Sequence, residues 1–94
     1  MKMANSTNNA DAAARAGAEF IQTEADAGVT FAEVALSTQD QQRRSRNTEN
    51  ALKAYRSVLH FAGRILLSDE QETVVQAKMQ KLREQLAKLG ERVE

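Results

Sequence analysis

The C-terminal quarter of the chain carries an unbroken apolar stripe at helical spacing. Gaps of four and three residues alternate along it, and its members are Val75, Met79, Leu82, Leu86, Leu89 and Val93. This spacing places all six side chains on one face of an α-helix, and an apolar face of that length must be buried against another element. The stripe therefore predicts a domain in which this helix packs against other helices.

Composition favours helices and narrows the possible chemistry. The chain has 94 residues and contains neither proline nor cysteine. Long periodic segments can therefore run as uninterrupted helices, while disulfides and thiolate metal sites are excluded. A domain of this size leaves little core for an enclosed active site. No segment has the apolar run of a signal peptide or membrane span, so we expect a cytoplasmic protein without membrane contact.

The first expected helix runs from about 10 to 42, after a tail at 1–9 that is polar, aperiodic and expected to be disordered. Gly28 is its weak point, because glycine inside a helix costs ~1 kcal/mol relative to alanine. The helix could break near 28–30 and restart at Thr30. Small residues lie near Gly28 on one face, and we favour the alternative that a neighbouring helix comes close there.

The second expected helix spans about 48–66. The segment before it, 41–50, has no apolar residue and predicts a turn near 43–47, with Asn47 or Thr48 as the helix cap. The apolar stripe is wide enough to contact two helices, which places this helix between the other two. Its members are Ala51, Leu52, Tyr55, Val58, Leu59, Ala62, Ile65 and Leu66.

The third expected helix covers about 69–90 and has the clearest end signals. Ser68 followed by Gln71 three residues later is a capping box, and acidic residues in the first turn suit the positive end of the helix dipole. Gly90 suits the C-cap, since glycine adopts positive φ readily. We therefore predict an all-α, three-helix, up-down-up bundle as a single domain over 10–94.

Catalytic and metal-binding patterns are weak. The one histidine, His60, has no carboxylate or second imidazole within a helical turn, and we interpret it as a surface residue. Paired carboxylates, such as Glu24 with Asp26, fit a solvated helix face. The four glycines form no phosphate-binding loop. We expect no enzyme activity, no cofactor and no metal.

Charge is balanced overall but uneven along the chain. Residues 43–67 hold six basic side chains and one acidic, whereas 1–42 hold two and six. The basic residues Arg43, Arg44, Arg46, Lys53, Arg56 and Arg64 could bind an anionic ligand or nucleic acid, or could pair with the acidic helices. Without interleaved aromatic residues for base stacking, we do not favour nucleic acid.

The run Ala51-Leu52-Lys53-Ala54-Tyr55 resembles the second helix of a tetratricopeptide repeat, with alanine followed by tyrosine four residues later. It is also similar to an Ala-Leu-x-x-Tyr step in microtubule interacting and trafficking domains. Arg46-Asn47, the Ala51/Tyr55 pair and Leu67-Ser68 before acidic residues resemble a group of short bacterial proteins. These resemblances imply a TPR-like helical fold and no activity.

The functional hypothesis is a small helical protein–protein interaction or self-association module. A second copy, or a helical or peptide partner, would dock in the groove between the first and third helices. Leu89 and Val93 extend beyond the part of the third helix that the second helix is expected to cover, so the long first helix or a second chain must cover them. In the second case we expect Leu86, Leu89 and Val93 to contact the partner. The alternative is an anionic ligand or nucleic acid on Arg43, Arg44, Arg46, Lys53 and Arg56.

Overall fold

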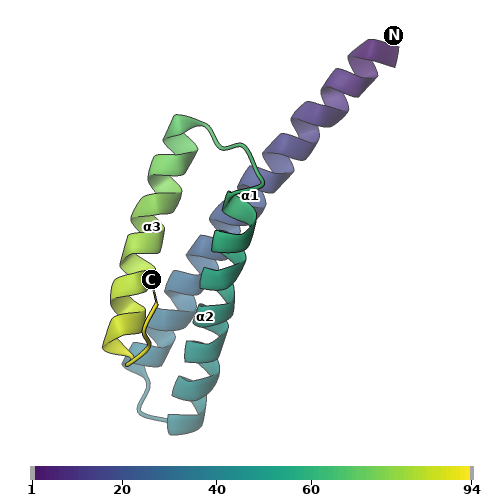
Figure 1. Cartoon of the computed structure of the whole chain (residues 1–94). Coiled ribbons are helices and arrows are strands. Elements are labelled where there is room, and N and C mark those ends of the chain that lie inside the picture. Colours follow the sequence, from purple (N-terminus) through teal and green to yellow (C-terminus); the bar gives the residue numbers. More distant parts are fainter. Residues whose placement is uncertain (1, 94) are drawn as a thin grey trace.

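The computed structural model describes residues 2–93, with side chains from Ala12 onward, and folds them as three helices (Figure 1). They are α1 (Lys2–Ser37), α2 (Gln41–Ala62) and α3 (Asp69–Lys88). The helices run up, down and up, which confirms the predicted all-α bundle. The prediction of a disordered tail at 1–9 falls on residues whose side chains lie outside the description, and it stays a prediction.

The middle position belongs to α1, and the prediction that the second helix occupies it is wrong. α1 packs extensively against both α2 and α3, whereas α2 and α3 touch each other sparsely. The buried seam of α1 explains this, because it consists almost entirely of small side chains that let two helices approach closely. Its members are Ala18, Ile21, Ala25, Gly28, Ala32 and Ala35.

Gly28 lies where all three helices converge, and α1 continues through it without a break. A Cβ atom added at Gly28 would lie 2.7 Å from Cδ2 of Leu82 on α3 and 3.2 Å from Cβ of Ala54 on α2. The missing side chain is thus what allows both neighbours to come close. This confirms the favoured interpretation of Gly28 as a site of close approach.

The turn between α1 and α2 lies at 38–40, earlier than the predicted turn at 43–47. The carboxylate of Asp40 caps α2 by accepting hydrogen bonds from the backbone N–H groups of Gln42 (3.0 Å) and Arg43 (3.4 Å). This cap starts the helix seven residues before Thr48. The polar segment that suggested a turn is an exposed helix start, because its side chains extend beyond the hydrophobic core.

Both predicted ends of α3 are confirmed. Ser68 and Gln71 form the reciprocal capping box, with backbone N–H to side-chain oxygen distances of 2.9 and 3.1 Å. At the other end Gly90 has φ +86°, Gly90 N–H donates to Ala87 O, and Glu91 N–H donates to Leu86 O. This is a Schellman motif, and it turns the chain so that Val93 packs back on the core.

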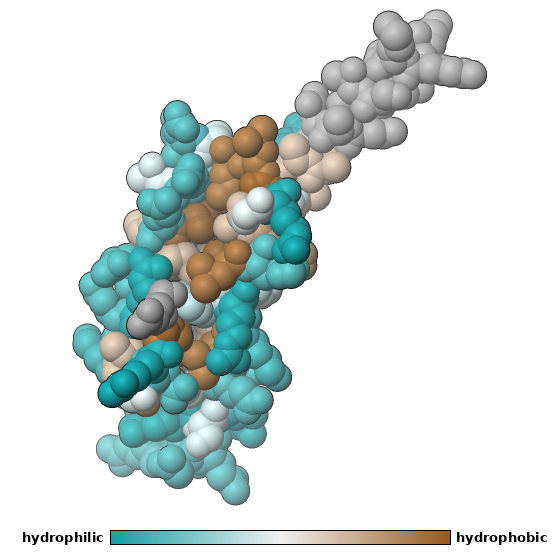
Figure 2. Space-filling view, in the orientation of Figure 1, coloured by the Kyte–Doolittle hydropathy of each residue, from teal (hydrophilic) through white to brown (hydrophobic). Residues whose placement is uncertain are grey.

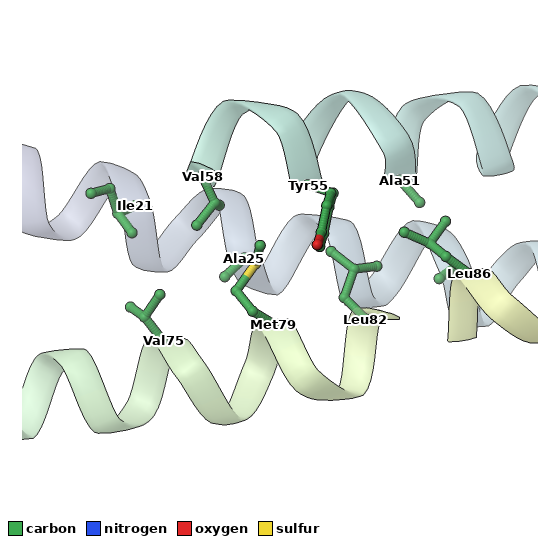
Figure 3. Close-up of a cluster of buried hydrophobic side chains, with 10 residues drawn as sticks. Ile21, Ala25, Ala51, Tyr55, Val58, Val75, Met79, Leu82 and Leu86 are labelled. Atoms are coloured by element: carbon green, nitrogen blue, oxygen red, sulfur yellow. The ribbon is translucent and has the colours of Figure 1, made fainter. Parts of the chain in front are cut away.

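The core lies along α1, where side chains from all three helices converge (Figure 3). Its largest fully buried members are Ile21, Leu82, Leu86 and Val58. α2 ends at Ala62, four residues before the predicted end, and the chain then turns through Gly63. Leu66, a member of the predicted stripe, consequently lies in the loop and is 88% exposed. Leu59 lies within α2, on a side that α1 does not cover, and is 50% exposed.

Candidate helix-docking surface

A groove of about 670 Å³ lies between α2 and α3, on the side of the bundle away from α1. Nearly buried Val58, Val75 and Met79 contribute its apolar floor. Half-exposed Leu59 lies along one side, and the polar chains of Gln76, Gln80 and Arg83 lie along the other. The groove exists because α2 and α3 each pack on the small seam of α1 without closing on each other.

The apolar surface continues around the end of the bundle where α2 and α3 are joined. Among the described residues, every exposed large hydrophobic side chain except Leu36 lies at this end. Figure 2 shows hydrophobic atoms gathered between α2 and α3 and around the loop that joins them. We call this set the cap patch, and it comprises Phe20, Leu59, Phe61, Leu66 and Val74.

Two contacts with α1 hold the cap patch in place. The rings of Phe20 on α1 and Phe61 on α2 meet edge to face, with centroids 5.4 Å apart. One turn earlier, Ile65 lies against Gly17, close enough that an added Cβ would be 3.1 Å from its side chain. These contacts fix Phe20 and Phe61 of the patch, and the start of the loop that carries Leu66, against α1.

α1 projects beyond the bundle from this same end (Figure 1). The side chains of residues 12–16 are all exposed, whereas Gly17 is partly buried and lies against Ile65 of the loop after α2. We call residues 12–16 the projecting segment; it consists of four alanines and Arg15. Such a segment presents a smooth helical surface to which another helix can pack closely.

The residues predicted to contact a partner on α3 lie at the opposite end of the bundle. Leu86 has 0% exposure and belongs to the core, so its prediction as a partner-binding residue is wrong. Leu89 and Val93 are partly buried against the same core. The same chain covers these three residues, because α1 is the central helix and the Schellman motif folds the C-terminal residues onto the core.

The basic residues of α2 are spread along the helix and are partly engaged. Arg44 Nη2 donates to the carbonyl of Thr38 (3.0 Å), and Lys53 Nζ lies 3.8 Å from Glu49 Oε1. Arg43, Arg46 and Arg56 are exposed.

A shallow pocket of about 310 Å³ beside Arg44 is also lined by Glu49 and Glu91. Its mixed charge gives an anion no concentrated positive field. In the described structure, the pocket beside Arg44 is therefore of mixed charge rather than basic.

His60 is exposed, near the end of α2. Arg64 Nη1 lies 3.0 Å from Nδ1 and 2.9 Å from Nε2 of its ring and donates to the His60 carbonyl, while Phe61 meets the ring edge to face. Across the described residues, no group of three or more His, Cys, Asp or Glu side chains has the arrangement needed to hold a metal ion.

The sequence does not predict the cap patch, because Leu59 and Leu66 have the spacing of a buried helical stripe. The available signal was the seam of α1, where alanine and glycine at alternating spacing of three and four mark the helix that is approached from two sides. A central α1 covers only part of the wide apolar stripe of α2, so this seam would have predicted exposed apolar residues on α2.

None of the helices within the described residues is long and apolar enough to cross a membrane.

Comparison with protein-family models, curated proteins and solved structures found no match to this chain.

Proposed function

We propose that this chain is a small helical protein–protein interaction module whose docking surface is the groove between α2 and α3 together with the cap patch. The observation that carries the proposal is the open groove with an apolar floor. A fourth helix laid in the groove, as in helix bundles, would bury apolar surface that α2 and α3 leave open.

The surface has the composition that helix recognition requires. An amphipathic helix binds by placing apolar side chains into a groove while polar residues line the rim. Here Leu59 offers an exposed apolar contact beside the buried floor, and Gln76 and Gln80 offer amide groups at the edge. The anionic-ligand alternative has no comparable supporting feature, since acidic residues share the pocket beside Arg44.

The test is selection from a displayed library of amphipathic helices with the folded chain as bait. We expect recovered helices to bind the wild-type chain and to lose binding when Leu59→Lys places a charge in the groove. A matched control is Ser45→Lys, at an exposed position near the other end of α2. Failure to recover any helix, or equal binding by the Leu59→Lys chain, contradicts the proposal.

A further inference from the structure

Two features of the chain have no packing partner among the described residues, and together they indicate what could bind the docking surface. The cap patch and the projecting segment are at the same end of the molecule. One is apolar surface that lacks a cover, and the other is a helical segment that lacks a neighbour among the described residues.

We infer that the groove and cap patch bind the projecting segment of a second copy of this chain, forming a symmetric dimer. This inference rests on the proposed function and names its partner. A twofold axis near this end places each projecting segment over the cap patch of the other protomer. Both patches are then covered by one symmetric operation, as in an isologous interface.

The dimensions fit this arrangement. α1 has 36 residues and α2 has 22, so α1 is longer by about 20 Å at 1.5 Å per residue. The molecule is 58 Å long, which matches the extension of α1 beyond the other helices. The projecting segment, residues 12–16, accounts for about 7 Å of this extension, enough to lie over the end of the groove next to the cap patch, between helices about 30 Å long.

The areas also point to a second copy. The exposed fractions of the cap patch correspond to about 500 Å² of apolar side chain, at the upper end of what monomers expose. A stable interface buries about 800 Å² on each partner. The cap patch alone is too small, and the exposed side chains of the projecting segment add to the surface that each protomer of the symmetric pair contributes.

Charge favours the same pairing. Arg15 is the one charged residue in the projecting segment. The first turn of α3, next to the cap patch, carries Asp69, Glu70 and Glu72. A basic residue approaching this acidic turn on the other protomer gives electrostatic complementarity that selects the orientation of the two chains.

Cysteine cross-linking tests the arrangement directly, because the chain has no cysteine of its own. One variant carries Ala13→Cys in the projecting segment, and a second, tagged to differ in mass, carries Ala77→Cys, which lines the groove. Mixed under mild oxidation, they should form a disulfide-linked heterodimer. Adding Leu66→Lys to the second variant should reduce the yield of the cross-linked heterodimer about tenfold, because an apolar anchor of the interface is lost.

The control replaces Ala77→Cys with Ser45→Cys, an exposed position near the opposite end of α2. Equal cross-linking of Ala13→Cys to both positions shows random collision and overturns the inference, as does the absence of a heterodimer. If the displayed helices still bind in a Leu59-dependent way, the surface recognises a different helical partner and the proposed function stands. If they also fail to bind, both proposals fall.

Discussion

Replacing Gly28 by alanine should destabilise the bundle, although alanine is the better helix former. The higher helix propensity of alanine alone would raise the free energy of unfolding by ~1 kcal/mol. Against it, the new Cβ would lie 2.7 Å from Leu82 Cδ2 and 3.2 Å from Ala54 Cβ. Leu82 is fully buried, so its methyl group can turn away only by displacing neighbouring core side chains, and the Ala54 Cβ is attached directly to the backbone of α2.

Overpacking of this kind costs about 2–3 kcal/mol, the upper part of the usual range, because neighbours on two helices are affected. The net loss is then about 1–2 kcal/mol of unfolding free energy. For a domain of this size, it lowers the midpoint of thermal unfolding by about 5–15 °C. Thermal unfolding followed by circular dichroism measures the shift directly.

Gly17→Ala is the matched control on the same helix. Its Cβ would meet only the side chain of Ile65, at 3.1 Å, and Ile65 is partly exposed and able to shift. We expect this variant to be as stable as the wild type or more stable. If Gly28→Ala raises the unfolding midpoint as much as Gly17→Ala does, the assignment of α1 as the closely approached central helix is refuted.

Three further predictions follow from the ends of α3 and the docking surface. Ser68→Ala should cost ~1 kcal/mol in chemical denaturation by removing the capping box, whereas Ser45→Ala should be neutral; equal effects would contradict the role of the cap. Gly90→Ala should cost ~1 kcal/mol because φ is +86°, while Gly63→Ala, with φ −77° and open space around it, should change stability little in the same assay. Leu66→Lys should alter the unfolding free energy by less than ~0.5 kcal/mol, since the side chain is 88% exposed, and a larger loss would show that Leu66 is structural.

The fold could be predicted where local chemistry decides it. The capping box at Ser68 and the glycine C-cap at Gly90 depend on residues within one turn, and both are confirmed. The α1–α2 turn was misplaced because several polar residues can cap a helix, and Asp40 precedes the alternatives considered. Local sequence does not show which of these candidates the packed bundle uses.

The docking surface depended on how the helices are arranged relative to one another. Leu59 and Leu66 have the spacing of buried residues. The central position of α1 leaves Leu59 exposed on α2, and the end of α2 at Ala62 leaves Leu66 exposed in the loop. Leu86 has the same kind of spacing and is fully covered. The apolar stripes identify the faces that need a partner, but whether that partner is in the same chain depends on tertiary packing.

The central claim is that the groove and cap patch bind a helical surface supplied by a second copy of the chain. Sedimentation equilibrium over a wide concentration range tests it most directly. We predict that the wild-type mass rises from 10.4 kDa to twice that value, while the chain with both Leu59→Lys and Leu66→Lys stays at 10.4 kDa and remains folded. A wild-type chain that stays at 10.4 kDa throughout, or a variant that dimerises equally well, would contradict the claim.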